Sequence, residues 1–111
     1  MIAKINMVCP NRICSADELN EAFVRLGGVL RYWEYDKKFF KSIKKIDKSV
    51  LEKFFKQIRK IFENPYVGKH MACNRKGQLE LYVADTFRLY YSYDERDNKI
   101  VFLEFSHKKY Q

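Results

Sequence analysis

The middle of the chain carries apolar residues at three- and four-residue steps, the spacing that places side chains on one face of a helix. A first helix is predicted after Asp36 and a second after Asp47, both of a type that caps helix starts, and the second ends at Asn64-Pro65. The apolar positions of the first are Phe39, Phe40, Ile43 and Ile46. Those of the second are Val50, Leu51, Phe54, Phe55, Ile58, Ile61 and Phe62. The pattern predicts a helical hairpin whose apolar faces cover another layer.

Residues 29–35 are rich in β-branched and aromatic types, and further along the chain apolar and polar residues alternate, as in strands with one buried face. Strands are therefore predicted over residues 29–35, 79–83, 87–92 and 100–103, the last apolar throughout like a central strand. The alternation places four side chains on the sheet face that points away from the helices: Glu80, Tyr82, Arg88 and Tyr90.

Ser15-Ala16-Asp17-Glu18 has the spacing of a capping box and predicts another helix that runs to about Leu26 and ends at Gly27-Gly28. Together the elements predict an α+β fold of order β-α-α-β-β-β, a mainly antiparallel sheet packed on a helical hairpin, with an extra N-terminal helix. We divide the chain into an N-terminal extension, residues 1–28, and a main domain, residues 29–111. The sequence leaves open whether the N-terminal helix covers a sheet edge or helps a dimer to form.

The 111 residues include 22 Lys and Arg against 14 Asp and Glu, a formal net charge of +8, and residues 37–64 carry most of the excess. Together with 16% aromatic residues, this composition excludes an acidic disordered chain. No apolar run approaches the roughly 18 residues of a membrane-spanning helix, and no signal-peptide pattern is visible. The spacing of Cys9, Cys14 and Cys73 fits no zinc pattern well, so we expect free thiols in a cytoplasmic protein without a membrane partner.

Arg88 lies between aromatic positions on the predicted open face, an arrangement that suits stacking on bases and neutralising phosphates, or equally a solvated sheet face. His107 precedes Lys108-Lys109-Tyr110; a histidine moves protons near neutral pH, and neighbouring lysines favour its neutral form and attract phosphate. A charged tail with a surface histidine is the alternative. His70, beside Lys69 and ahead of Arg75-Lys76-Gly77, has the same two interpretations.

Four segments in this order resemble the RelE/ParE toxin superfamily. They are Glu63-Asn64-Pro65 after the helical hairpin, the basic loop with Gly68-Lys69-His70 and Asn74-Arg75-Lys76-Gly77, the run from Asp85 to Tyr91, and His107-Lys108-Lys109-Tyr110. The resemblance covers about residues 30–111 and leaves the first part of the chain outside it.

The resemblance implies the toxin of a type II toxin–antitoxin system and, in the RelE branch, a ribosome-dependent endoribonuclease that cleaves mRNA in the A site. In that branch the 2′-OH of the RNA attacks the adjacent phosphate, so neither a metal nor another cofactor is implied. The implied roles are a phosphate-stabilising arginine at Arg88, an acid–base histidine at His107 as in YafQ-like members, a C-terminal aromatic at Tyr110, and a further base at His70. The implied RNA-binding residues are Lys69, Arg75, Lys76, Tyr82, Tyr90, Lys108 and Lys109.

Two other functions remain open at this point: a ParE-like inhibitor of DNA gyrase, and a non-catalytic RNA-binding relative. The implied partners are a cognate antitoxin that is acidic where it faces the toxin, and mRNA with the ribosome. A homodimer and a toxin–antitoxin heterotetramer are both compatible with the sequence.

Overall fold

A computed structural model describes residues 12–107 of the chain, and in this part five strands form one mixed sheet in the order β1-β5-β4-β3-β2. The strands are β1 (Tyr32–Tyr35), β2 (Lys69–His70), β3 (Leu79–Val83), β4 (Phe87–Asp94) and β5 (Lys99–His107). The α-helices are α1 (Ala16–Phe23), α2 (Lys37–Lys44) and α3 (Lys48–Glu63), and shorter helical turns are η1 (Val24–Gly28), η2 (Pro65–Val67) and η3 (Cys73–Arg75). Only β1 and β5 pair in parallel. The predicted α+β fold is confirmed.

Each α-helix begins at the predicted capping residue. The Ser15 hydroxyl accepts a hydrogen bond from the Glu18 amide at 3.2 Å, and the Glu18 carboxylate accepts one from the Ser15 amide at 3.0 Å, which completes the capping box. Asp36 and Asp47 accept hydrogen bonds from amides three residues later. Gly27 follows α1 with a φ of 121°, a value that glycine adopts without strain. Local side-chain chemistry therefore fixes the helix boundaries.

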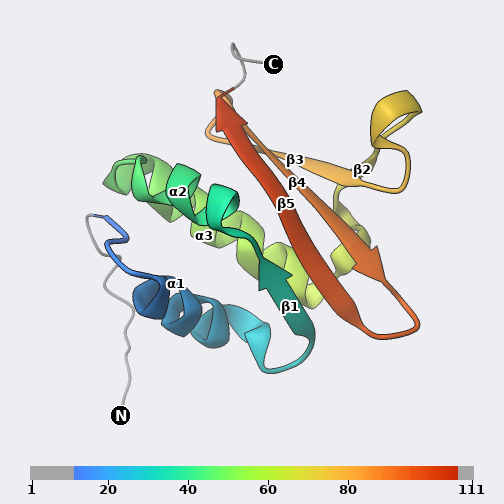
Figure 1. Cartoon of the computed structure of the whole chain (residues 1–111), viewed down its shortest axis with the longest axis horizontal. Coiled ribbons are helices and arrows are strands. Elements are labelled where there is room, and N and C mark those ends of the chain that lie inside the picture. The colour runs from blue at the N-terminus through green and yellow to red at the C-terminus, as the bar shows by residue number, and fades with distance from the viewer. Residues whose placement is uncertain (1–11, 108–111) are drawn as a thin grey trace.

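The helices and the sheet share one core that is rich in aromatic rings. Figure 1 shows α3 crossing one face of the sheet, α1 lying beside α3 next to β1, and α2 alongside β5. Phe23 of α1 is fully buried, and its ring centroid lies 5.1–6.2 Å from those of five other rings. These are Trp33 and Tyr35 of β1, Phe54 and Phe62 of α3, and Phe102 of β5. The N-terminal helix is thus packed into the same core as the main domain.

A β-bulge divides β5 into two parts. Tyr90 of β4 pairs with Glu104, but the next residue, Tyr91, pairs with Phe102, so Leu103 is one residue in excess on β5. The bulge lets Phe102 and Phe105, three positions apart, both point into the core, where they are 1% and 2% exposed. Before the bulge the even-numbered residues Ile100 and Phe102 face the core, and after it the even-numbered residues Glu104 and Ser106 face the opposite side of the sheet.

Several predicted boundaries are wrong. The strand predicted from residue 29 begins at Tyr32, because the Leu30 amide bonds to the Gly27 carbonyl at 3.0 Å and closes a turn that leaves Val29 and Leu30 exposed. β2 falls in a segment predicted as loop, and β4 and β5 extend beyond the predicted 87–92 and 100–103. Two-residue strands carry too little alternation to be seen in a sequence.

Two of the three cysteines lie among the described residues. Cys14 and Cys73 are exposed free thiols, and Cys9 lies outside the described residues. Residues 12–107 contain no group of three His, Cys, Asp or Glu side chains with the geometry to hold a metal ion. None of the helices in that range has the length and apolar character needed to cross a membrane.

Replacement of Phe23 by alanine tests whether α1 belongs to the cooperative core. Removing a fully buried phenylalanine leaves a cavity among five aromatic rings, so we expect the free energy of unfolding to fall by about 3–5 kcal/mol. Urea denaturation followed by circular dichroism measures the change. Val24→Ala, at an adjacent exposed position, is the matched control and should cost less than about 1 kcal/mol. Equal small losses from both variants would show that α1 is not part of the core.

Candidate functional site

The candidate site lies on the outer face, which we define as the side of the sheet opposite α3. Two rows of paired side chains cross β3, β4 and β5 on this face: Glu80, Tyr90 and Glu104 in one row, and Tyr82, Arg88 and Ser106 in the other. Glu80, Tyr82, Arg88 and Tyr90 therefore share one face, as the alternation predicted. The opposite face carries the buried Leu79, Val83, Leu89 and Tyr91.

Arg88 lies between a carboxylate and two tyrosines. Its Nη1 is 3.5 Å from Glu80 Oε2, and its Cζ lies 5.3 Å from the centroid of the Tyr82 ring. A hydrogen bond with Tyr90 is the largest influence that raises the pKa of Arg88, so the guanidinium remains charged. The Arg88 side chain is 26% exposed, whereas Glu80 is 7% exposed. The buried Glu80 carboxylate therefore contacts the Arg88 guanidinium, and part of the Arg88 side chain remains exposed to solvent.

Arg75 folds over the outer face from η3 and covers Tyr90. Its Cζ lies 3.7 Å from the centroid of the Tyr90 ring, and its Nη2 donates a 2.8 Å hydrogen bond to Glu104 Oε1. Its Nη1 donates a second hydrogen bond to Gln78 Oε1 at 3.1 Å. Tyr90 is only 3% exposed beneath this cover. Two of the residues predicted to bind RNA, Arg75 and Tyr90, are therefore packed on each other, whereas another of them, Tyr82, is 53% exposed.

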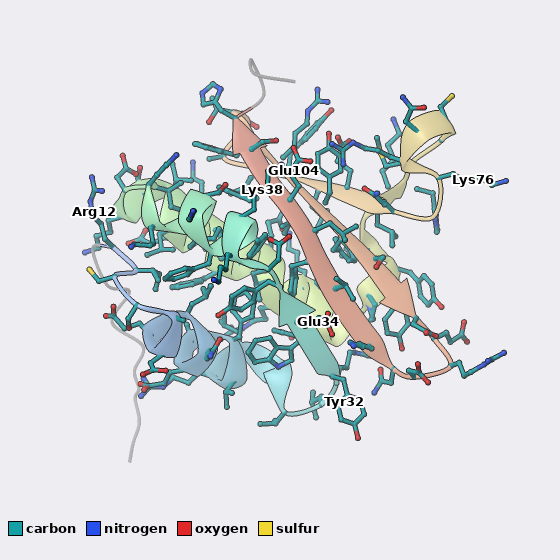
Figure 2. All side chains as sticks on the ribbon, in the orientation of Figure 1. Arg12, Tyr32, Glu34, Lys38, Lys76 and Glu104 are labelled. Carbon is teal, nitrogen blue, oxygen red and sulfur yellow. The ribbon has the colours of Figure 1, made fainter. Side chains whose placement is uncertain are left out.

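The neighbours of Glu104 favour the ionised form of its carboxyl group. Burial is the largest single influence and raises its pKa, but hydrogen bonds from Arg75 and Ser106 and the charges of Arg75 and Lys38 outweigh it. The net result is a pKa of Glu104 below its ordinary value of 4.5. Figure 2 labels Lys38 near Glu104, whose pKa the charge of Lys38 helps to lower, and Lys76 farther away on the basic loop. Arg75 and Glu104 form a second Arg–Glu pair beside that of Arg88 and Glu80.

The start of the basic loop is anchored on the buried Tyr91. The Tyr91 hydroxyl donates to the Pro65 carbonyl at 2.8 Å and accepts from the Gly68 amide at 3.0 Å, and burial raises the pKa of Tyr91 to about 12. A Cβ at Gly68 would lie 2.7 Å from that hydroxyl oxygen, so the close approach requires glycine. In the register of β2 with β3, Lys69 then lies opposite Glu80, and His70 lies opposite Leu79 at the edge of the sheet.

His107 is not on the same face as Arg88. It pairs with Phe87, and its ring lies 5.0 Å from the Phe87 ring in an edge-on contact, whereas Arg88 pairs with Ser106. Because neighbouring residues of a strand point to opposite faces, His107 lies on the helix side of the sheet end. Lys108, Lys109 and Tyr110, three further predicted site residues, lie outside the described part of the chain.

A sequence model of the family described as "ParE toxin of type II toxin-antitoxin system, parDE" matches residues 33–111. The chain belongs to this toxin family. Membership of the RelE/ParE superfamily, predicted from short motifs, is thereby confirmed. Residues 12–32, with α1, precede the matched part but pack into its core. A comparison with curated protein sequences gives no match.

Solved toxin structures share the fold of this ParE-family toxin. The RelBE2 toxin–antitoxin complex of Mycobacterium tuberculosis matches at 19% identity and a TM-score of 0.61, over 69% of this chain and 96% of that chain. The intact E. coli RelBE complex matches at 14% identity and a TM-score of 0.61, over 69% and 95%. The isolated E. coli RelE toxin matches at 14% identity and a TM-score of 0.59, over 69% and 83%. At these identities the likeness shows the fold.

Sequence reasoning missed Glu104 as a member of the toxin's outer face. Counting in twos from Ile100 assigns Glu104 to the same face as the buried Phe102, and only the bulge at Leu103 reverses this assignment. The one available signal was the pair Phe102 and Phe105, two large apolar residues three positions apart in a strand.

The pH dependence of stability tests the pair of Arg75 and Glu104. A carboxyl whose pKa is lowered in the folded protein stabilises it above the unfolded pKa, and the contribution is lost as the pH falls through the folded pKa. We therefore expect wild type to be more stable than Glu104→Gln near neutral pH, and the difference to shrink below pH 4.5. Urea denaturation as a function of pH measures it. In an Arg75→Ala background the difference should be smaller, and an unchanged difference there would contradict the pairing.

Proposed function

We propose that this chain is a type II toxin that binds mRNA on its outer face, cleaves it in the ribosomal A site in the cytoplasm, and is neutralised by a cognate antitoxin. The observation that carries the proposal is the position of Arg88, a charged and partly open guanidinium beside the exposed ring of Tyr82. An aromatic ring next to a cation suits an unstacked base and the phosphate attached to it. Lys69 and Lys76, both exposed, add positive charge at the rim.

The proposed reaction uses the RNA as its own nucleophile. The 2′-oxygen forms a bond to the adjacent phosphorus, and the bond from phosphorus to the 5′-oxygen breaks, which leaves a cyclic phosphate and a 5′-OH. Arg88 stabilises the negative charge that develops on the phosphate oxygens. A base must take the 2′ proton and an acid must protonate the leaving oxygen. From the resemblance to RelE-like toxins, we propose His107, Tyr110 and His70 for these roles. A carboxylate also lies next to Arg88, since Glu80 Oε2 is 3.5 Å from Arg88 Nη1.

The proposed antitoxin partner follows from charge and from the related complexes. The structures of RelBE2 and RelBE are toxin–antitoxin complexes. In this chain residues 37–64, which contain α2 and α3, carry ten Lys and Arg against three Asp and Glu. A partner segment that is acidic where it meets these helices gains favourable electrostatics and a fast association rate.

A second candidate function is inhibition of DNA gyrase. Two observations favour it: the family model that matches is that of ParE, and His107 lies on the helix side of the sheet, away from Arg88. A gyrase inhibitor needs no acid–base pair.

Replacement of Arg88 by alanine tests the proposed RNA cleavage. We expect growth arrest on lone expression to disappear and A-site cuts, mapped by primer extension in a translation reaction, to fall about 100-fold or more, because one preorganised cation contributes on this scale. Arg96→Ala, at an exposed position in the turn after β4, is the matched control and should remain fully active. Arg88→Ala leaves Glu80 buried without its cation, so Arg88→Ala/Glu80→Gln is measured beside it and must fold and be equally inactive.

The His107→Ala variant separates the two functions. Under the cleavage proposal this variant loses most of its toxicity and of its A-site cuts. Full toxicity of His107→Ala together with intact mRNA and inhibited supercoiling would contradict RNA cleavage and establish gyrase as the target.

A further inference from the structure

Two tight turns carry Arg75 from the basic loop onto the outer face. The Arg75 amide donates to the Ala72 carbonyl at 3.2 Å, and the Gln78 amide donates to the Arg75 carbonyl at 3.0 Å. Cys73 and Gly77, on either side of Arg75, have φ values of 56° and 92°, which occur where a chain turns sharply. The backbone of the loop therefore fixes the point from which the Arg75 side chain extends.

The guanidinium of Arg75 lies flat on the Tyr90 ring. Its Cζ is 3.7 Å from the ring centroid, within the van der Waals contact distance of about 3.5–4.0 Å. So close an approach requires the planar guanidinium to lie roughly parallel to the ring. Tyr90 is buried beneath it, whereas the Arg75 side chain is 32% exposed. At this position the surface that a ligand can contact is therefore the guanidinium and not the ring.

Two side chains hold this guanidinium by its edge. Its hydrogen bonds to Gln78 Oε1 and Glu104 Oε1 lie in the guanidinium plane, because the N–H groups of arginine point outward in that plane. They fix the orientation of the plane without covering its face. An arginine that is already ordered loses little further conformational entropy when a ligand binds, so the exposed face of Arg75 is a preorganised flat surface.

This flat surface lies beside Arg88. Tyr90 and Arg88 are two positions apart on β4 and point to the same face, so Arg75 on Tyr90 is about 7 Å along the strand from Arg88. The exposed Tyr82 ring lies on a different side of Arg88, across the pair of β3 and β4, and its centroid is 5.3 Å from the Arg88 Cζ. A phosphate bound at Arg88 therefore has two flat surfaces next to it, one aromatic and one cationic.

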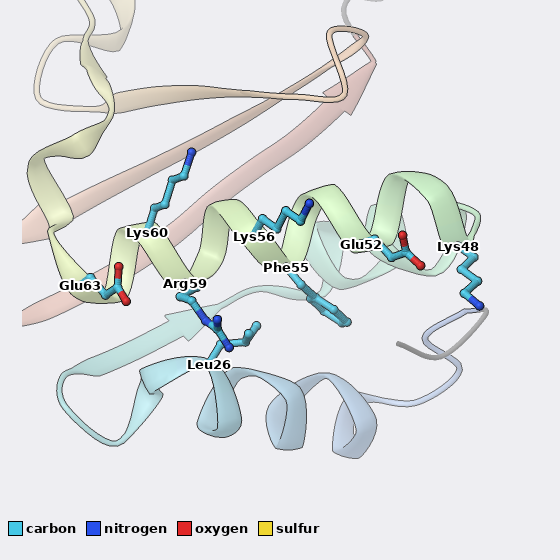
Figure 3. A pocket seen from close by; sticks show the side chains of 8 residues that line it. All are labelled: Leu26, Lys48, Glu52, Phe55, Lys56, Arg59, Lys60 and Glu63. Carbon is cyan, nitrogen blue, oxygen red and sulfur yellow. The ribbon is translucent and has the colours of Figure 1, made fainter. Parts of the chain in front are cut away.

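Another basic surface of the chain lies on α3. Figure 3 shows Arg59 pointing from α3 toward Leu26, in a groove that Phe55 also lines. Because α3 crosses the face of the sheet opposite to Arg75 and Arg88 (Figure 1), a base held next to Arg88 meets Arg75 and not Arg59.

We propose that the exposed face of Arg75 stacks on the base of one of the two nucleotides joined by the phosphate at Arg88, a role that rests on the function proposed above. Unstacked RNA bases bind to guanidinium planes as they do to aromatic rings. A purine covers more of the plane than a pyrimidine, so Arg75 gives the toxin a modest preference for a purine at that position of the codon.

The alternative is that Arg75 is a cover that leaves Tyr90 when RNA arrives. Such a movement breaks the hydrogen bonds to Gln78 and Glu104 and removes the cation that is paired with the Glu104 carboxylate. Stacking on Arg75 in its present position keeps all of these contacts. The structure therefore favours a fixed surface for a base over a movable cover.

Cleavage of mRNAs that lack a single base tests this role. Ribosomes are programmed with mRNAs in which each A-site nucleotide in turn is abasic but keeps its 2′-OH, and kcat/KM is measured with purified chain. For wild type we expect the loss of one base next to the cut to lower kcat/KM about tenfold or more, because stacking of a base contributes on this scale.

The variant Arg75→Lys keeps a positive charge near Glu104 but has no plane on which a base can stack. We expect it to cleave the intact mRNA about tenfold more slowly than wild type. On the mRNA that is abasic at the sensitive position, Arg75→Lys and wild type should differ less than about twofold, because the contact that the variant removes is already absent. Arg96→Lys, the same exchange at an exposed position in the turn after β4, is the matched control and should behave as wild type on every mRNA.

The outcomes separate failure of this role from failure of the function. If Arg75→Lys slows the cleavage of intact and abasic mRNAs by the same factor, Arg75 is structural and the stacking role is wrong. Wild-type cleavage of every abasic mRNA, or wild-type activity of Arg75→Lys on the intact mRNA, would overturn it as well. Faster cleavage by Arg75→Ala would show that Arg75 is a cover of Tyr90. Absence of any cleavage of intact mRNA by wild type would overturn the proposed function and this role together.

Discussion

The burial of Phe23 among five aromatic rings is the contact on which the arrangement of the molecule depends. The rings come from β1, α3 and β5, so a single side chain of α1 joins the extension to both layers of the domain. Arg31 reinforces the same end, because its Nε donates to the Phe62 carbonyl and its Nη1 to Asn98 Oδ1, both at 2.8 Å. These contacts lie at the end of the molecule where η1, with the buried Leu26, packs against α3.

Because aromatic rings and aliphatic side chains fill one face of the sheet, the glutamates and the arginine of β3, β4 and β5 are directed to the other. There they form two Arg–Glu pairs on either side of Tyr90, Arg88 with Glu80 and Arg75 with Glu104. Largely buried charges are tolerated only when they are paired, so the network also fixes the positions of both guanidinium groups. Under the proposed function, an RNA phosphate that approaches this face must compete with the two carboxylates for the arginines. The two Arg–Glu pairs also leave this part of the outer face close to neutral.

The sequence predicted the elements well where local chemistry decides them. The helix starts at Ser15, Asp36 and Asp47 follow from side chains that bond to nearby amides, and the shared face of Arg88 and Tyr82 follows from simple alternation. The bulge at Leu103 was not predictable in this way, because it depends on how two strands pair. The bulge places His107 and Arg88, which the motifs had assigned to one catalytic site, on opposite faces of the sheet. Long-range contacts such as Arg75 on Tyr90 leave no periodic signal.

We propose that Arg88 stabilises the attack of an mRNA 2′-OH on the adjacent phosphate, and this step can be tested directly. The most direct measurement uses purified wild-type chain, programmed ribosomes and two mRNAs that differ by one 2′-deoxynucleotide at the scissile position of the A-site codon. Attack by the 2′-OH predicts a cut in the all-ribose mRNA, with a cyclic phosphate at the new end, and no cut in the 2′-deoxy mRNA. Cleavage of both, or of neither while the chain still arrests growth, would contradict it.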